Sequence, residues 1–92
     1  MSERRKHTRE TYNDSIEFVV LEETDDGLDR KHAHGTIVDV SSVGIGLQTH
    51  YALQEGHVVE WDDKHEKGKL HIALVKWSRK IEDFYRAGLL FI

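Results

Sequence analysis

The stretch TIVDVSSVGIGLQT (residues 36–49) places two strand-like segments on either side of a short polar turn. TIVDV (36–40) is rich in β-branched residues, which favour strands, and IGLQT (45–49) alternates with period two. SSVG (41–44) is typical of a turn, because serine side chains bond to nearby backbone groups and glycine permits a close backbone approach. The stretch therefore predicts two neighbouring strands joined by a tight turn.

Other parts of the chain show the same short, alternating pattern. Polar, glycine-containing segments separate them and predict loops, notably TDDGLDRKHAHG (24–35) and DDKHEKGK (62–69). Residues 51–56 and 78–86 have helical alternatives that are too short to form a layer. Six short strands without long helices predict an all-β fold, either a sandwich or a six-stranded antiparallel barrel, and a barrel would remove the exposed edges. The expected strands are 15–22, 36–40, 45–49, 57–61, 70–77 and 84–92.

Alternation also assigns faces within two of these strands. In the first, Ile16, Phe18 and Val20 are expected to share one face. In the fifth, one face is expected to carry Leu70, Ile72 and Leu74, and the other His71, Ala73, Val75 and Trp77.

The composition of the chain limits which classes of protein it can belong to. A chain of 92 residues, with 38% hydrophobic and 33% charged residues, is sized for one globular domain. No apolar run approaches the length needed to cross a bilayer, and the absence of cysteine excludes disulfides and thiolate metal sites. We expect a cytoplasmic protein without membrane insertion. The net charge of −4 argues against binding to long nucleic acid.

The stretch ERRKHTRE (residues 3–10) is a basic exception on this acidic chain, with Arg4, Arg5, Lys6 and Arg9. It precedes every hydrophobic pattern, so residues 1–12 are expected to form a mobile arm before a barrel over residues 13–92. The planar guanidinium group of arginine can donate two parallel hydrogen bonds to phosphate oxygens or to the edge of guanine. Alone, however, such a run is usually a solvated tail.

A second polar motif, DVSSVG, covers residues 39–44. Asp39 and Ser41 are two residues apart, so their side chains share a face if this segment is extended. A carboxylate can accept hydrogen bonds from guanine N1–H and its exocyclic amine, and a hydroxyl can meet a phosphate. For either residue alone, an ordinary turn is the better explanation.

The two motifs together, Arg-x-x-x-Arg before the first strand and Asp-x-Ser-x-x-Gly between the second and third, resemble the PilZ domain family. The segments DVSSVGIGLQT, ALVKW and FYRAGLLFI are similar to that family's strands as well, so the resemblance covers nearly the whole chain.

This resemblance implies a PilZ-like six-stranded barrel that binds the bacterial second messenger cyclic di-GMP, with no other cofactor. Arg5 and Arg9 match the motif arginines, which are expected to meet guanine edges and phosphates. Asp39, Ser41 and Gly44 match the second motif.

The resemblance also gives roles to residues outside the two motifs. Arg4 occupies a position that favours a stacked ligand dimer, and Gly46 matches a structural glycine. Trp77 matches an aromatic near the ligand, and a place in the core is an equal alternative.

Two further implications concern signalling. The arm is expected to order over the ligand and so create a surface for a downstream protein partner. Little or no helix is expected after the last strand, because the sequence stops at Ile92 where that strand should end. A stand-alone receptor and a domain cut from a longer chain both fit this observation.

Other classes of function have weaker support. His32 and His34 share a strand face, but a zinc site would need Asp29 or His71 as well, so no metal site is expected. Asp39, Ser41 and Ser42 have no histidine in a triad context, and no enzyme is expected. A small-barrel RNA-binding module and a PilZ-like protein adaptor without nucleotide binding remain as alternatives.

Overall fold

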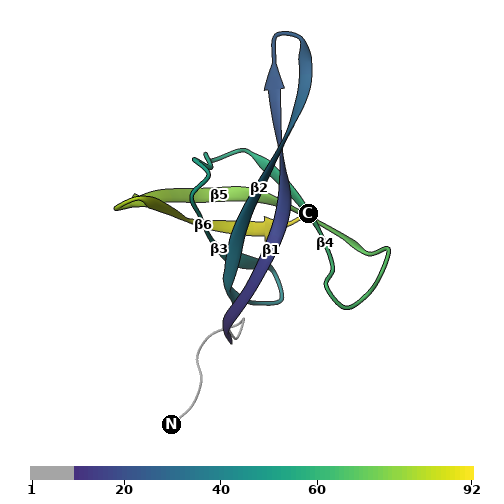
Figure 1. The fold of residues 1–92 in the computed structure, drawn as a ribbon, viewed down its shortest axis with the longest axis vertical. Helices are drawn as coiled ribbons and strands as arrows, with labels where there is room; N and C mark the ends of the chain where they lie inside the picture. The colour runs from purple at the N-terminus through teal and green to yellow at the C-terminus, as the bar shows by residue number, and fades with distance from the viewer. Residues whose placement is uncertain (1–9) are drawn as a thin grey trace.

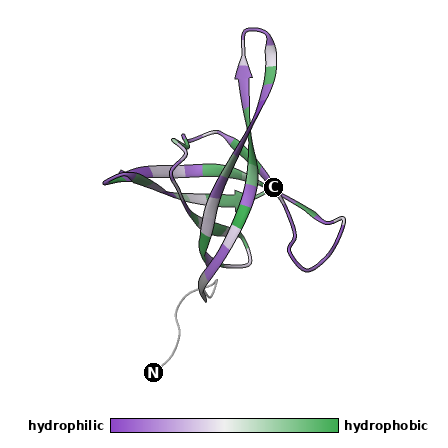
Figure 2. Cartoon of the chain, in the orientation of Figure 1, coloured by the Kyte–Doolittle hydropathy of each residue, from purple (hydrophilic) through white to green (hydrophobic). Residues whose placement is uncertain are grey.

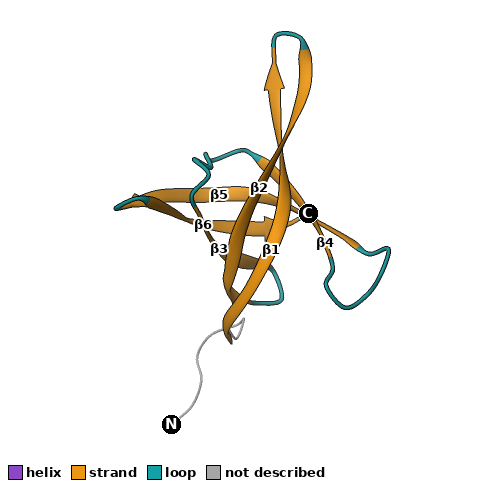
Figure 3. Cartoon of the chain, viewed as in Figure 1, coloured by secondary structure: helices purple, strands orange, loops and turns teal. Residues whose placement is uncertain are grey.

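The computed structural model describes residues 10–92, which form six strands and no helix (Figures 1 and 3). Residues 1–9 lie outside the described part, and with them Arg4, Arg5 and Arg9 of the expected arm. No helix that could cross a membrane occurs in residues 10–92. The strands are β1 (Glu10–Thr24), β2 (Gly27–Val40), β3 (Gly44–Thr49), β4 (Val58–Asp62), β5 (Leu70–Ile81) and β6 (Phe84–Phe91).

The sheet closes on itself in the order β1-β2-β3-β6-β5-β4, and every neighbouring pair is antiparallel. Closure depends on the middle of β1, where Val19, Val20 and Leu21 pair with β4 on the edge opposite β2. The expected all-β, six-stranded antiparallel barrel is therefore confirmed.

The core fills the inside of the barrel. Ile16, Phe18 and Val20 of β1 all face it, as the alternation predicts, and are 8%, 1% and 0% exposed. Figure 2 shows hydrophobic residues in the strands of the barrel body and hydrophilic ones along the projecting hairpin. Each fully buried aliphatic or aromatic side chain stabilises the fold by roughly 1.5–3 kcal/mol. The remaining core residues are Ile37, Ile45, Leu47, Leu53, Val59, Trp61, Ala73, Val75, Ala87 and Leu89.

One loop expected from the sequence is in fact a strand. Residues 27–35, read as part of a polar loop, belong to β2, and only Asp25 and Asp26 form the turn to β1. The outer part of the β1–β2 hairpin projects beyond the barrel (Figure 1), and residues 27–32 of β2 are exposed on both of its faces. Without a buried face, the strand carries no period-two hydrophobic signal.

Other boundaries differ by a few residues. β1 begins at Glu10, so residues 10–12 of the expected arm lie in this strand. β5 continues to Ile81 and turns at Glu82 and Asp83 into β6, and no helix forms over residues 78–86 or 51–56. Glu82 has a φ of 57°, the left-handed value that lets the chain reverse there.

The turn between β2 and β3 depends on Gly44. Its φ is not positive; what requires glycine is the close approach of β6, since an added Cβ would lie 2.0 Å from the carbonyl oxygen of Leu89. The obstructing atom is backbone, so relief would require β3 and β6 to separate. A close backbone approach is the role that the sequence suggests for this glycine.

We expect Gly44→Ala to lower the free energy of unfolding by about 2 kcal/mol or more, because the methyl group overpacks a backbone contact. Urea unfolding followed by far-ultraviolet circular dichroism measures the change. Val43→Ala, next in the chain and 36% exposed, is the control and should change stability by less than about 0.5 kcal/mol. Equal effects of the two substitutions would contradict this explanation.

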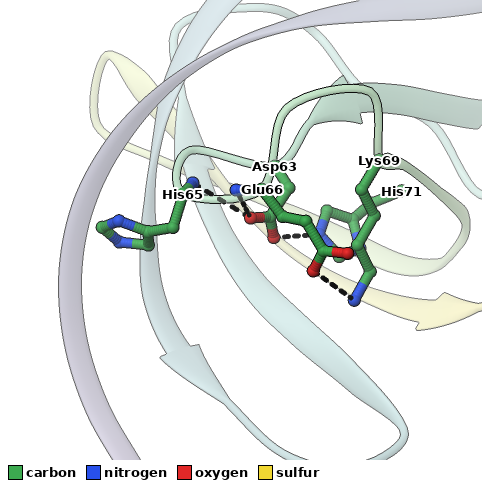
Figure 4. Close-up of polar contacts among 5 residues, drawn as sticks. All are labelled: Asp63, His65, Glu66, Lys69 and His71. Atoms are coloured by element: carbon green, nitrogen blue, oxygen red, sulfur yellow. Dashed lines mark hydrogen bonds and ion pairs between the residues drawn. The ribbon is translucent and has the colours of Figure 1, made fainter.

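The loop between β4 and β5 is organised by Asp63 (Figure 4). One carboxylate oxygen accepts the backbone N–H groups of His65 (3.0 Å) and Glu66 (2.7 Å). The other lies 2.7 Å from Nε2 of His71, whose ring stacks on Trp61 with centroids 5.3 Å apart. Lys64 in the same loop forms an ion pair with Asp14 of β1. These contacts tie the loop to the end of the barrel.

The hydrogen bond from His71, followed by those from the backbone of Glu66 and His65, lowers the pKa of Asp63 from 3.8 to about 2. Because the folded-state pKa is below the unfolded value, the carboxylate stabilises the fold above about pH 4. That contribution is lost as the pH falls toward 2.

We therefore expect the stability difference between the natural protein and Asp63→Asn to shrink progressively as the pH falls from 4 to 2. Asparagine keeps an oxygen acceptor but has no charge to lose. Chemical unfolding at half-unit pH steps measures the difference. A difference that stays constant down to pH 2 would show that the Asp63 charge has no such role.

Candidate functional site

Two β-bulges turn Asp39 and Trp77 to the outside of the barrel. Ile37 faces the core opposite Leu47, and strict alternation would place Asp39 inside as well. The register shifts between Ile37 and Asp39, so Val38 is an extra residue and Asp39 pairs with Gly46. The insertion of one residue reverses the face of everything that follows it.

The same event occurs in β5. Val75 is buried opposite Leu89, the register shifts by one residue at Lys76, and Trp77 then pairs with Gly88. Trp77 is 45% exposed. The expectation that Trp77 shares a face with Val75 is thus wrong, and so is the alternative that Trp77 packs in the core. The physical reason is the bulge, which alternation in the sequence does not reveal.

These two side chains border a row of paired residues across four strands, in the order Asp39, Gly46, Gly88 and Trp77. The two middle positions are glycines over which the flanking side chains lean. A Cβ on Gly46 would lie 2.7 Å from a carboxylate oxygen of Asp39, and one on Gly88 would lie 2.1 Å from Nε1 of Trp77. The row is a shallow floor with a carboxylate at one side and an indole at the other.

Two arginines adjoin this floor. Arg86 and Arg79 pair directly across β6 and β5, each two residues from a member of the row. Arg86 Nη2 lies 3.9 Å from Oδ2 of Asp39, and Cζ of Arg79 lies 5.6 Å from the ring centroid of Trp77, within the range of a cation–π contact. The Nε atom of Arg86 is buried and has no hydrogen-bond partner among residues 10–92. A buried donor without a partner carries a free-energy cost.

Together these residues form a groove of about 240 Å³ on the outer face of the barrel. The groove combines a hydrogen-bond acceptor, an exposed aromatic ring, the guanidinium of Arg86 and the ammonium of Lys76, while Arg79 lies outside it against the ring of Trp77. This combination can bind a planar, anionic molecule by stacking, by hydrogen bonds to its edge and by charge. Its lining residues are Asp39, Ile45, Gly46, Lys76, Trp77, Arg86, Gly88, Leu89 and Leu90.

Ser41 and Gly44 do not line this groove. Ser41 is 7% exposed and lies beyond the end of β2, so it does not continue the extended segment that contains Asp39. Its backbone N–H donates to the carbonyl of Gly44 (2.9 Å), and its hydroxyl accepts the N–H of Val43 (3.3 Å). In this structure, the two residues build the turn next to Asp39.

A comparison with solved structures finds a chain similar to this one: the PilZ domain of YcgR from Escherichia coli, solved with c-di-GMP. The two share 18% sequence identity with a TM-score of 0.53, over 98% of this chain and 79% of the other. The chain has a PilZ-like fold. No protein-family model and no curated protein matches the sequence. At this level of identity, the likeness establishes the fold of the barrel.

Within the PilZ-like barrel, the residues expected to form the site divide into three groups. Asp39 and Trp77 border the groove, Ser41 and Gly44 build the adjacent turn, and the arginines of the arm lie outside the described residues. Gly46, expected to be structural, forms part of the floor.

Arg79 and Arg86 were not predicted. A single arginine within a strand carries no motif, and only the register places these two beside Asp39 and Trp77. The one signal was the alternation of Arg86 with Gly88, which puts both on one face of the last strand.

The histidines do not assemble a metal site in the described part of the PilZ-like barrel. His32 and His34 lie on β2, and no group of three or more potential ligands occurs in residues 10–92.

We expect Gly88→Ala to displace the indole of Trp77 while the barrel stays folded, because the obstructing atoms belong to a movable side chain. In a ¹H–¹⁵N correlation spectrum, the indole N–H resonance of Trp77 should shift. Trp61, which is 6% exposed in the core, is the internal control and should keep its resonance. An unshifted Trp77 resonance would contradict the packing of its ring over Gly88.

Proposed function

We propose that this protein is a receptor for cyclic di-GMP and that the groove between Asp39 and Trp77 holds a guanine of the ligand. The observation that carries the proposal is the two-glycine floor, bordered by a carboxylate and an exposed indole. The likeness to a PilZ domain solved with c-di-GMP supports the choice of nucleotide. The role is one of binding and signalling, without catalysis.

Each group in the groove has a function in this proposal. The carboxylate of Asp39 accepts guanine N1–H and the exocyclic amine, a pair of donors that adenine lacks. The exposed ring of Trp77 offers a stacking face, and the two glycines allow the indole and the carboxylate to lie close against the strands. The guanidinium groups of Arg86, whose side chain is 36% exposed, and of Arg79 supply donors and charge for phosphate oxygens.

The groove holds only part of the ligand. Its 240 Å³ lie below the roughly 300–1,000 Å³ of sites that enclose a drug-sized molecule. The remainder would be covered by Arg4, Arg5 and Arg9. The register favours this arrangement, since Thr11 pairs with Asp39 and Arg9 precedes Thr11 by two residues.

Closure of the arm over the ligand costs conformational entropy, and the hydrogen bonds between the arginines and the ligand can offset this cost. Fixing the backbone costs roughly 1–2 kcal/mol per residue. Hydrogen bonds to charged groups contribute roughly 1.5–3 kcal/mol each, and three arginines offer several of them. The ordered arm would then present a new surface to a downstream protein, which in this proposal acts in the cytoplasm.

Calorimetric titration with cyclic di-GMP tests the proposal. The natural protein should bind, and Arg5→Ala, Arg9→Ala and Asp39→Asn should each weaken binding by about tenfold or more, because each removes charge-assisted contacts. Arg30→Ala is the matched control: it removes an arginine of the hairpin, paired with Glu60, and should leave the affinity unchanged.

Cyclic di-AMP and a short single-stranded RNA serve as ligand controls and should bind far more weakly. A folded natural protein that binds no cyclic di-GMP would contradict the receptor assignment and favour a protein adaptor. Preference for the RNA would favour an RNA-binding module instead.

A further inference from the structure

The projecting half of the β1–β2 hairpin has an open edge (Figure 1). β1 and β2 pair without interruption from Asp14 to the turn, but β2 pairs with β3 only from Gly35 onward. In residues 10–92, no strand therefore pairs with the outer edge of β2 between Leu28 and His32. This segment of β2 is exposed throughout, so another chain can reach its edge.

The backbone groups on that edge can be assigned. The carbonyl of His34 points toward β3, because it accepts a hydrogen bond from Oγ1 of Thr49 at 2.6 Å. Backbone groups alternate between the two edges of a strand. The N–H and C=O groups of Leu28, Arg30 and His32 thus face the open edge, while those of the residues between them face β1.

The open edge has the length to pair with a second copy of itself. In an antiparallel pair, residues whose backbone groups face the shared edge lie opposite one another. When Arg30 lies opposite its own counterpart, Leu28 of each copy lies opposite His32 of the other. The strand of the second copy then ends at its Gly27, before the point at Gly35 where β3 begins to pair. A register moved two residues toward β3 would place that Gly27 opposite Gly35, where β3 already lies.

The charges on the edge are complementary to themselves in this register. Asp29 of each copy lies directly opposite Lys31 of the other, which gives two cross-strand ion pairs. Both pairs occupy positions without backbone hydrogen bonds, where facing side chains are closest and opposite charges stabilise the pairing. Moving the register by two residues in either direction places Asp29 opposite Asp29 or Lys31 opposite Lys31, and like charges there are destabilising.

The central pair brings two arginines together, and the fold already neutralises each of them. Nη2 of Arg30 lies 3.0 Å from Oε1 of Glu60 on β4. This ion pair draws the guanidinium across β1, away from the open edge. The Tyr51 hydroxyl also donates to the Glu22 carboxylate of the hairpin at 2.9 Å. The edge is thus held in a defined position, which lowers the entropic cost of pairing.

We propose that this protein forms a two-fold symmetric dimer in which Leu28–His32 of β2 pairs with the same segment of a second copy. The two hairpins then form one four-stranded sheet between the barrels. Because the interface is small, the dimer belongs to the transient class and is populated at high protein concentration. The inference does not use the nucleotide groove and stands whether or not the protein binds cyclic di-GMP.

Sedimentation equilibrium of the natural protein at concentrations up to about 1 mM measures the dimer. The buffer has about 0.15 M salt and a pH of about 7.5, at which an ordinary histidine is neutral. In the ¹⁵N-labelled protein, amide exchange at Leu28, Arg30 and His32 should slow by about threefold or more from dilute to concentrated samples, because their N–H groups gain acceptors. Asp29 and Lys31, already bonded to β1, should change little.

Two charge variants test the register. Asp29→Lys and Lys31→Asp each turn both ion pairs into like-charge pairs, so each should weaken the dimer by about fivefold or more. An equimolar mixture of the two variants has opposite charges at both pairs, as does the double variant, and both should associate as the natural protein does. Lys67→Asp, in the loop between β4 and β5, makes the same charge change elsewhere and should leave the dimer unaltered.

His32→Pro removes an N–H that β1 does not use and should abolish the dimer with the barrel spectrum retained. The proposal is overturned if the natural protein stays monomeric up to about 1 mM. A dimer that persists in His32→Pro would place the interface elsewhere and overturn it as well. So would a mixture of the two charge variants that associates no better than either variant alone.

Discussion

The interior of this barrel is filled by apolar side chains, and the positions of the charged residues follow from that constraint. Phe18, Val20, Leu47, Val59 and Val75 are almost completely buried and fill the space between the strands. A carboxylate or a guanidinium among them would lose its hydration without gaining a partner. Polar and functional groups therefore have to lie on the outer face, at the ends of the barrel or on the hairpin beyond it.

The candidate groove arises where the alternation that fills the core is interrupted. In β2 and again in β5, one inserted residue moves the next side chain of the inner face to the outside. Asp39 and Trp77 reach the outer face in this way, and each leans over a glycine of the neighbouring strand. A carboxylate and an aromatic ring, contributed by strands far apart in the sequence, thus border one shallow surface without disturbing the core.

The sequence predicted the strands of the barrel body because a strand with one buried face alternates visibly. It could not predict the outer half of the hairpin, where residues such as Arg30 and His32 have water on both sides. The motif around Asp39 indicated a binding site. The outward direction of the Asp39 side chain depends on a bulge, however, and the residue types in the sequence do not reveal that bulge. The sequence did not predict Arg86 as a site residue for a related reason, since only the pairing of β6 with its neighbours places it beside Asp39.

A third irregularity interrupts β1 itself, between Thr11 and Asp14, beside the bulge of β2. Beyond this point, the ladder with β2 is continuous from Asp14 to the turn, whereas the segment before it pairs only through Glu10 and Thr11. A bulge bends a strand locally and absorbs twist. The direction in which Glu10 and Thr11 run beside Asp39 is therefore set independently of the long hairpin at the other end of the same strand.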